Sequence, residues 1–559
     1  MTVVICTLNS KYIHCSPAPW YLLAGIKEHC LPGISGVVVE GTINEQTDEV
    51  LMRICDKKPH VVGFSCYIWN IEATIRLIKK LKVIMPDVIT VLGGPEVSYN
   101  AGQILKTESS VDYIISGEGE KPFALFLNDI LQGKWPQSIP GLCFRDNDQI
   151  VLSKPYISCE QPPSPYTEEY FEALKGRIAY LETSRGCPYH CAYCLSGRCG
   201  SVRFFDIDRA KKELLLLANS GTKTIKLIDR TFNANSKRAN ELFLFIINNY
   251  GKAIPYGTRF HFEIAGDILD NQTLDILALA PLGAMQLEIG LQSFNDKTLN
   301  AVNRKTNLER LKYNIKRLVD NANLHIHIDL IAGLPYEDYE SLMHSFNTAF
   351  ELRPNMLQLG FLKLLHGSPM RDRPDKYPCR FSSRPPYEVI ETPWMSKSDL
   401  QSLHRTEDAL QRLYNSGRFT RTIEYLLEKI SCSPFELFTS FGEYFEQCRC
   451  KRISLDDFTA LVFEYFSKQT NIDKAVLRDI MVCDRLSSNP SGHIPLTLKI
   501  KDEIIDKKLK KLKKSNTKKG VRRGVAYLYS QKCAVYADYV DKNPVTGQYP
   551  LTKVQLLAD

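Results

Sequence analysis

Three cysteines on one short segment are the strongest chemical signal in the sequence. Cys187, Cys191 and Cys194 have the spacing Cys-x3-Cys-x2-Cys. Three thiolates on one tight loop are typical of an iron–sulfur cluster. A structural zinc ion takes four ligands, and His190 or Cys199 would then have to be the fourth. A [4Fe–4S] cube held by three cysteines keeps one iron open for a further ligand, and we favour this interpretation over zinc.

The elements that must position these cysteines form a region of alternating strands and helices. Six strand-like apolar runs occur there, at residues 178–183, 224–229, 260–264, 284–289, 324–330 and 356–362. Six β/α units in one block predict a partial barrel over residues 176–374, with its chemistry at the carboxyl ends of the strands. Polar residues occur at or just beyond those ends, namely Asp229, Glu263, Glu288, Gln292, Ser293 and Asp329.

A second alternating region precedes the barrel. Residues 1–135 alternate short apolar runs with helical patterns, which predicts a doubly wound, Rossmann-like parallel sheet. Ligands of such sheets bind at the carboxyl ends of the strands, and glycines there let the backbone approach a bulky ligand closely. Ordinary turn glycines are the alternative. The candidate cofactor-binding residues are Ser65, Tyr67, Trp69, Gly93, Gly94, Pro95, Glu96, Gly117, Glu118, Gly119 and Glu120.

The rest of the chain differs in composition from both regions. Residues 136–175 are rich in proline and serine, and we interpret them as a linker that begins with a short hairpin near residues 141–152. Residues 375–559 are predicted to form a mainly helical extension with a strand-like end at 525–555. Free thiols are favoured over a second cluster for Cys432, Cys448, Cys450 and Cys483, because their spacing is not typical of a ferredoxin. The predicted fold class is therefore α/β with a helical C-terminal domain.

Charge is concentrated in one segment of the 559-residue chain. The 71 basic and 63 acidic residues leave a net charge of +8, and residues 501–523 alone hold eleven basic and three acidic side chains. Ile505, Leu509 and Leu512 form one apolar stripe among the lysines, which predicts an amphipathic helix. It could be a solvated helix packed by its stripe, or it could contact RNA phosphates. A membrane surface is a weaker fit because no Trp or Phe accompanies the stripe.

No feature of the sequence predicts secretion or a membrane partner. The first residues, 1–7, indicate a strand and not a signal peptide, and no apolar run approaches the roughly 20 residues that span a bilayer. The 17 cysteines are an odd number spread over a long chain, which does not indicate a disulfide framework. We therefore expect a cytoplasmic protein with reduced thiols.

The cysteine segment, with Tyr193 as the aromatic residue before the third cysteine, resembles the signature of the radical S-adenosylmethionine (SAM) superfamily. The resemblance covers about residues 176–370, including 287–293 and 329–335. It implies that Cys187, Cys191 and Cys194 hold a [4Fe–4S] cluster whose open iron binds SAM. It also implies an oxygen-sensitive enzyme that needs an electron donor such as flavodoxin or ferredoxin. By the same likeness, the candidates for SAM contacts are Tyr193, Glu263, Glu288, Gln292, Ser293, Arg304 and Asp329.

A doubly wound domain ahead of such a barrel resembles the cobalamin-binding subgroup of that superfamily. Ser65 and Tyr67 loosely match its Ser-x-Leu motif, and Gly93 with Gly94 matches its Gly-Gly motif. The motif Asp-x-His-x-x-Gly is absent, so no histidine is assigned as the lower axial ligand of cobalt, and His14 is interpreted as an ordinary loop residue. Tyr67 or Trp69 could instead supply an apolar lower face.

The resemblance implies a reaction in which SAM methylates cobalamin and a second SAM yields a radical that activates an unactivated substrate carbon for methyl transfer. Three alternatives remain open. The first is radical ring formation or rearrangement without methyl transfer. The second is an RNA-modifying enzyme whose N-terminal domain binds RNA and not cobalamin, and the third is a noncatalytic cobalamin sensor. The helical extension, through residues 413–419, resembles an uncharacterised extension of some such proteins. Whether the substrate is a small molecule or RNA is not indicated by cofactor motifs.

Overall fold

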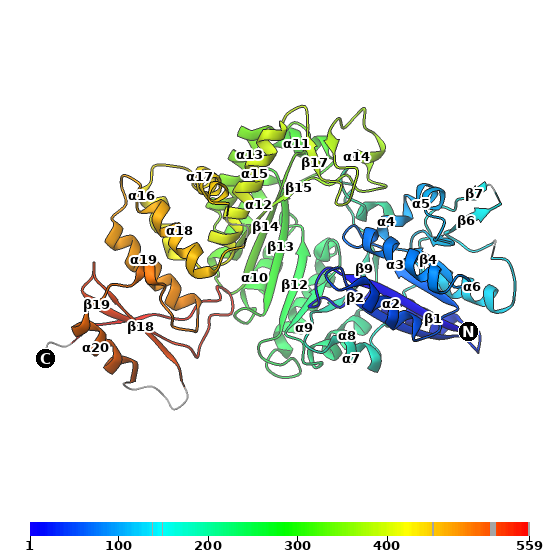
Figure 1. Cartoon of the computed structure of the whole chain (residues 1–559), viewed down its shortest axis with the longest axis horizontal. Coiled ribbons are helices and arrows are strands. Elements are labelled where there is room, and N and C mark those ends of the chain that lie inside the picture. Colours follow the sequence, from blue (N-terminus) through cyan, green and yellow to red (C-terminus); the bar gives the residue numbers. More distant parts are fainter. Residues whose placement is uncertain (137, 148, 450–451, 515–520, 557–559) are drawn as a thin grey trace. The chain divides into compact units, whose positions relative to one another are not determined.

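The computed structural model describes the chain except residues 137, 148, 450–451, 515–520 and 557–559 and the side chain of residue 199 (Figure 1). It divides into two compact units. Unit 1 consists of residues 1–265, 300–305 and 362–393, and unit 2 consists of residues 266–299, 306–361 and 394–559.

The N-terminal part of unit 1 is a seven-stranded sheet of order β2-β1-β3-β4-β5-β6-β7. Its first five strands are parallel, which confirms the doubly wound prediction. The predicted hairpin forms as β6 and β7, and it pairs antiparallel with β5, so the sheet continues past residue 135. The strands are β1 (Thr2–Asn9), β2 (Ser35–Thr42), β3 (Val61–Ser65), β4 (Ile89–Gly93), β5 (Tyr113–Ile115), β6 (Leu142–Asp146) and β7 (Gln149–Val151).

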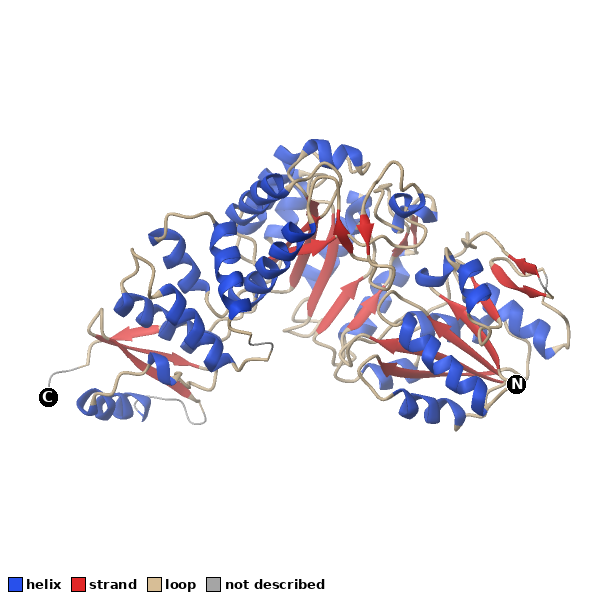
Figure 2. Ribbon diagram, turned by 45° about the horizontal axis from the view of Figure 1, so that its top comes forward, coloured by secondary structure: helices blue, strands red, loops and turns tan. Residues whose placement is uncertain are grey.

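Helices cover this sheet because its strands are apolar on both faces (Figure 2). Val4, Cys6 and Leu8 of β1 belong to a core with α2 (Thr47–Cys55) and α3 (Ile71–Ile84). Successive strand residues point to opposite faces, so Val3 and Ile5 point to the other side. There α1 (Ala18–His29) packs against α6 (Glu120–Leu131). Two short helices follow β4, namely α4 (Pro95–Ser98) and α5 (Ala101–Thr107).

Unit 1 also contains the first three strands of the predicted barrel. β8 (Ala179–Leu181), β11 (Thr224–Leu227) and β12 (Arg259–Ile264) are parallel neighbours, and α8 (Ile207–Ala218) and α9 (Ser236–Asn249) connect them. Asp206 and Asn235 cap the two helices by accepting a backbone N–H in the first turn. The remaining elements of unit 1 are α7 (Glu168–Leu174), β9 (Ser184–Arg185), η1 (Ser196–Cys199), β10 (Arg203–Phe204), η2 (Phe232–Ala234), α14 (Pro369–Asp372), β16 (Arg380–Phe381) and β17 (Val389–Glu391).

Unit 2 contains the other three predicted strands, which are also parallel. The strands are β13 (Met285–Gln292), β14 (His325–Ala332) and β15 (Met356–Phe361), and all six predicted barrel strands therefore form. The helices of this region are α10 (Asn271–Ala278), α12 (Leu308–Asp320) and α13 (Tyr339–Glu351), while α11 (Asp296–Ala301) ends at the boundary of unit 2.

The C-terminal part of unit 2 is helical, as predicted, around an aromatic core in which Phe346 contacts Phe435 and Phe438. Its Tyr-rich end is a three-stranded antiparallel sheet. No helix in the described residues is long and apolar enough to cross a membrane. The elements are α15 (Lys397–Leu410), the π-helical turn η3 (Gln411–Asn415), α16 (Thr420–Lys429), α17 (Pro434–Gln447), α18 (Leu455–Phe466), α19 (Lys474–Ser488), η4 (Leu496–Leu498), α20 (Glu503–Lys514), β18 (Arg523–Leu528), β19 (Cys533–Asp538) and β20 (Thr552–Val554).

Candidate functional site

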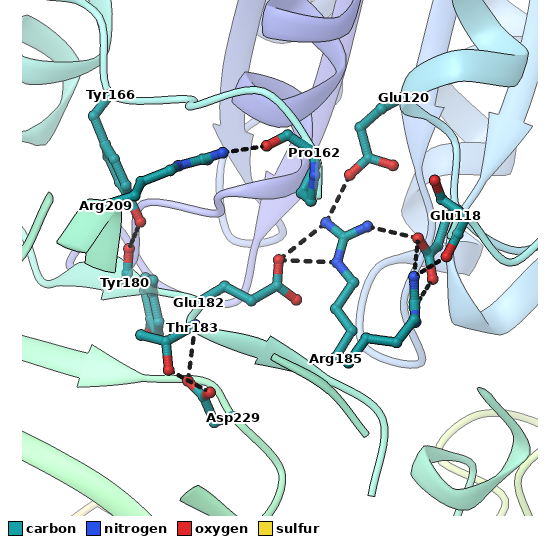
Figure 3. A network of polar contacts seen from close by, with 12 residues as sticks. Glu118, Glu120, Pro162, Tyr166, Tyr180, Glu182, Thr183, Arg185, Arg209 and Asp229 are labelled. Atoms are coloured by element: carbon teal, nitrogen blue, oxygen red, sulfur yellow. Dashed lines mark hydrogen bonds and ion pairs between the residues drawn. The ribbon is translucent and has the colours of Figure 1, made fainter. Parts of the chain in front are cut away.

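The loop that carries the three cysteines (residues 186–199, the cysteine loop) is anchored by a buried carboxylate. Asp229 follows β11 and is almost fully buried. It accepts hydrogen bonds from the backbone and hydroxyl of Thr183, at 3.1 and 2.8 Å, and from the hydroxyl of Ser184 at 2.5 Å (Figure 3). Burial raises the pKa of Asp229, and these hydrogen bonds oppose the rise. Gly186 then turns the chain into Cys187 with φ +96°, a conformation that favours glycine.

Each of the three sulfur atoms lies near one polar hydrogen-bonding group. Cys187 and Cys191 are 8% and 7% exposed, and Cys194 is half-buried. Hydrogen bonds to sulfur stabilise a thiolate, which is the form that binds a metal. The three thiols therefore fit the chemistry of a cluster ligand set. The contacts are Thr231 Oγ1 at 3.3 Å from Cys187 Sγ, Arg304 Nη1 at 3.7 Å from Cys191 Sγ, and the Ser196 amide at 3.4 Å from Cys194 Sγ.

A cavity of about 310 Å³ lies in unit 1 at the carboxyl ends of β3, β4 and β5. Apolar side chains and glycine backbone make up most of its wall, which suits contact with an apolar part of a ligand. The wall is closely packed at Gly94, because a Cβ added there would lie 2.5 Å from the carbonyl oxygen of Cys66. Nine of the predicted cofactor-binding residues line the cavity, namely Ser65, Tyr67, Gly93, Gly94, Pro95, Gly117, Glu118, Gly119 and Glu120.

Two predicted residues, Trp69 and Glu96, do not line this cavity. Trp69 is 46% exposed and its ring stacks on Tyr67, with 4.4 Å between the ring centres. Glu96 is buried, and its carboxylate accepts a hydrogen bond from the hydroxyl of Tyr387. His14 is a loop residue, as expected, and its Nδ1 lies 2.6 Å from the hydroxyl of Tyr180.

The cavity wall also contains residues that the sequence did not single out. Tyr21 and Phe123 come from α1 and α6, and Glu182, Arg185 and Arg230 come from the barrel strands and their loops. The guanidinium of Arg185 forms ion pairs with three carboxylates of the cavity wall, those of Glu118, Glu120 and Glu182 (Figure 3). Although burial alone disfavours its charge, Glu120 and Glu182 hold the pKa of Arg185 above its ordinary value. No local spacing signals the contacts of Arg185 with Glu118 and Glu120, because 65 or more residues separate them in the chain.

Three of the predicted SAM contacts belong to unit 1. Arg304 reaches Cys191, as given above, and its guanidinium carbon lies 6.0 Å from the ring centre of Tyr189. Tyr193 is half-buried, and burial raises the pKa of its hydroxyl. The Glu263 carboxylate lies 4.0 Å from the guanidinium of Arg230, the residue before Thr231. Tyr193 and Arg304 thus lie at the cysteine loop, and Glu263 lies near the segment that contacts Cys187.

The other four predicted SAM contacts, Glu288, Gln292, Ser293 and Asp329, belong to unit 2. His327 lies between Glu288 and Asp329, with nitrogen–oxygen distances of 3.7 and 3.0 Å. His327 could have been identified as a third member of this polar group. It pairs in register with Glu288 of the neighbouring strand and lies on the same strand face as Asp329.

Ser293 contacts a buried carboxylate that the sequence did not single out. Its hydroxyl donates to Glu337 at 2.5 Å. Gln292, beside it, has φ +76°.

Three of the four cysteines considered for a second cluster lie in the described part of the structure. Cys432 and Cys448 are half-buried and Cys483 is buried, and none of the three forms a disulfide bond. Cys450 and the side chain of Cys199, the alternative zinc ligand, lie outside the described part of the structure.

Comparison with known families assigns three consecutive parts of the chain. The B12 binding domain model matches residues 10–127, the radical SAM superfamily model matches residues 181–349, and a protein domain of unknown function, DUF4080, matches residues 375–534. The first match lies within the predicted Rossmann-like region of residues 1–135, and the second contains the cysteine loop. The chain therefore combines a B12 binding domain with a radical SAM domain, and both resemblances expected from the sequence are confirmed.

Curated relatives and a solved structure agree with this class. The chain is 24% identical over 433 residues to 2-(S-pantetheinyl)-carbapenam-3-carboxylate methyltransferase of Streptantibioticus cattleyicolor, covering 69% of this chain and 61% of that protein. It is 25% identical over 340 residues to anaerobic magnesium-protoporphyrin IX monomethyl ester cyclase of Rubrivivax gelatinosus, covering 57% and 59%. The chain thus spans about three fifths of the length of these relatives.

The fold is similar to that of the cobalamin-dependent S-adenosylmethionine radical enzyme OxsB, solved with aqua-cobalamin and S-adenosylmethionine bound. The TM-score is 0.58 at 15% identity, covering 86% of this chain and 78% of that one. The α/β fold class with a helical C-terminal region is confirmed. At this identity the likeness concerns the fold alone.

Proposed function

We propose that this protein is a cobalamin-dependent radical SAM methyltransferase that acts on an unactivated carbon of a small molecule. The observation that carries the proposal is the placement of both candidate cofactor sites in unit 1. Arg185 lines the cavity and lies two positions before Cys187 in the chain. One residue of the cavity wall and the cluster ligand set thus lie on one short segment of the chain.

The cysteine loop would hold the [4Fe–4S] cluster through Cys187, Cys191 and Cys194. When bound, the cluster supplies the electron that cleaves SAM, and cobalamin supplies a carrier for the methyl group. Arg304 places a positive charge next to Cys191 Sγ, where it stabilises thiolate charge. Asp229 fixes the chain before Cys187, so the ligand set is positioned before the metal binds.

The cavity would hold cobalamin between the glycine-rich strand ends and the aromatic wall. Gly93, Gly94 and Gly117 keep side chains out of that wall, and Tyr67 offers the edge of an aromatic stack. In the described lining no histidine reaches the cavity. The residues present therefore suit a cobalamin whose cobalt has no imidazole ligand from the protein.

Two alternatives have an observation in their favour. The match to an anaerobic cyclase supports radical ring formation without methyl transfer. The basic helix α20 supports an RNA substrate, because five of its lysines are exposed: Lys507, Lys510, Lys511, Lys513 and Lys514. The small-molecule substrate is favoured because the methyltransferase relative is named for a small carbapenam.

The proposal includes a partner and a compartment. Reductive cleavage of SAM needs a one-electron donor, for which we propose a flavodoxin or a ferredoxin. The described cysteines form no disulfide bonds, which is typical of a reducing compartment. We therefore propose a cytoplasmic location.

Anaerobic reconstitution with iron, sulfide and hydroxocobalamin tests the proposal. Reduced protein supplied with methyl-labelled SAM and extracts of anaerobically grown cells should release deoxyadenosine and pass label to a small metabolite. A labelled nucleoside in digested RNA would support the RNA alternative, and an unlabelled cyclised product would support the cyclase alternative.

The Cys191→Ala variant supplies the control for the cluster assignment. It should lose the cluster absorbance and all deoxyadenosine, whereas Cys143→Ala, which changes a buried cysteine of β6, should retain both. Deoxyadenosine from the Cys191→Ala protein would overturn the assignment of the cysteine loop.

A further inference from the structure

We propose that Arg185 is a positioning residue that links the cysteine loop to the cavity wall, so that cluster binding and cobalamin binding strengthen one another. This inference rests on the proposed function, because it assigns the two ligands to these two sites. It concerns the ionic network of Arg185, Glu118, Glu120, Glu182 and Arg203 (the Arg185 network; Figure 3).

The guanidinium of Arg185 is bound from three directions. Its Nη1 donates to Glu118 at 3.0 Å and its Nη2 donates to Glu120 at 2.7 Å. Nε and Nη2 also donate to the same oxygen of Glu182, at 3.1 and 2.9 Å. Glu118 and Glu120 belong to the B12 binding domain region, whereas Glu182 follows β8 of the radical SAM region. One side chain thus joins the two regions within unit 1.

A second arginine strengthens the junction from the facing strand. Arg203 of β10 pairs in register with Arg185 of β9, and both guanidinium groups bind the carboxylate of Glu118. These ionic side chains are mostly buried, so their geometry is restricted and solvent screens them weakly. Lysine could not replace Arg185 equivalently, because an ammonium lacks the planar fork that serves several carboxylates together.

Both candidate sites depend on the position of these residues. Glu118 and Glu120 alternate along the chain with Gly117 and Gly119, and all four line the cavity. On the other side, only Gly186 separates Arg185 from Cys187. A displacement of the cavity wall would therefore shift the backbone that enters the cysteine loop, and the reverse also holds.

Coupling of this kind has a thermodynamic consequence. A ligand that holds one side of the Arg185 network in place reduces the conformational entropy of the whole network. The second ligand then loses less free energy in ordering the same side chains. The effect must be reciprocal, and typical couplings between sites change affinity by about 5- to 150-fold. Cluster-loaded protein should therefore bind hydroxocobalamin at least fivefold more tightly than protein without the cluster.

The test is an anaerobic titration of the full chain with hydroxocobalamin, with and without the reconstituted cluster. The informative variant is Glu118→Gln/Glu120→Gln, which removes the two carboxylates of the B12 binding domain region but leaves Arg185 paired with Glu182. The control is Glu213→Gln. Glu213 is a buried carboxylate that pairs with Arg209 at 2.8 Å and is not part of the cavity lining. Iron content and the electron paramagnetic resonance spectrum report the cluster independently of turnover.

We expect the ratio of the two affinities to fall to about one in the double variant and to stay at the wild-type value in Glu213→Gln. Arg185→Lys should give an intermediate ratio, which separates coupling from general loss of the fold. A wild-type ratio of one, or an unchanged ratio in the double variant, would overturn the coupling alone. Wild-type protein that binds no hydroxocobalamin would overturn the proposed function as well.

Discussion

The carboxylate of Glu96 accepts a hydrogen bond from the hydroxyl of Tyr387, although 291 residues separate them in the chain. Glu96 follows Pro95, which lines the cavity, and Tyr387 lies in the segment of residues 362–393 that returns to unit 1. The same segment reaches the cysteine loop, since the Met370 amide donates to the carbonyl of Ala192 at 2.9 Å. This segment therefore contacts the cysteine loop and also a residue adjacent to the cavity wall.

Tyr387→Phe should weaken this contact without changing the shape of the side chain. Burial raises the pKa of Glu96 and the Tyr387 hydrogen bond opposes that rise, so the variant leaves a buried carboxylate less well satisfied. We expect a loss of about 1–3 kcal/mol in the free energy of unfolding at pH 7, measured with urea. Because the raised pKa favours the protonated folded form at low pH, the loss should be smaller at pH 5.

Tyr377→Phe is the matched control, because Tyr377 is equally buried in the same segment and its hydroxyl makes one longer hydrogen bond, of 3.4 Å, to Ala301. Its loss should be clearly smaller. Equal losses in the two variants would show that the Glu96 contact contributes nothing specific.

Gly94→Ala should damage the cavity wall directly. Gly94 has φ +107°, and a Cβ would lie 2.5 Å from the Cys66 carbonyl oxygen, so both the backbone and its neighbour must shift. We expect destabilisation of about 1–3 kcal/mol and weaker binding of hydroxocobalamin, followed by absorbance titration. Gly102→Ala in α5 is the control, because its nearest contact is a flexible Leu152 methyl at 3.3 Å. Normal cobalamin binding by Gly94→Ala would contradict the assigned wall.

Glu337→Gln should remove a pH dependence from unit 2. Burial raises the pKa of Glu337 from 4.5 to about 8, and Ser293 and Ser345 oppose the rise. The folded state keeps this proton while the unfolded state releases it above pH 4.5. Stability from this group is therefore lost as the pH rises towards 8, by at most about 1.4 kcal/mol per pH unit.

The stability of Glu337→Gln relative to the wild type should accordingly increase between pH 5 and pH 8 and then level off. Calorimetric midpoints of both proteins across this range measure the difference. A difference that does not change with pH would mean that Glu337 is ionised in the folded protein.

Replacing Lys507, Lys510, Lys511, Lys513 and Lys514 by glutamine should leave folding and SAM cleavage unchanged. The stripe of Ile505, Leu509 and Leu512 is half-buried, and α20 packs against β18, so the lysines do not hold the helix in place. The thermal midpoint and the rate of deoxyadenosine release check this. Salt-dependent binding of transfer RNA that is present in the wild type and lost in the variant would instead favour the RNA substrate.

The sequence predicted the elements of the fold because their signals are local. Alternating apolar runs identified the Rossmann-like sheet and all six barrel strands, and nine of the residues predicted at strand ends line the cavity. One limit came from tertiary pairing. The hairpin near residues 141–152 was predicted within a linker, yet it pairs with β5.

The site was harder to predict where partners are distant in the chain. Glu96 was grouped with the cavity residues because it follows Gly-Gly-Pro, but its side chain meets Tyr387. Arg185 was not identified, because only the folded chain brings its ion-pair partners Glu118 and Glu120 next to it. Contacts over 65 to 291 residues leave no periodicity in the sequence.

The path of the chain through the two units has a consequence for dissecting the protein. The backbone leaves unit 1 after residue 265, revisits it at 300–305 and again at 362–393, and ends in unit 2. The region that matches the domain of unknown function begins at residue 375, inside the last visit to unit 1. A chain truncated before residue 375 would therefore lose Tyr387 and part of a folded body, so the matched domains do not coincide with the structural units.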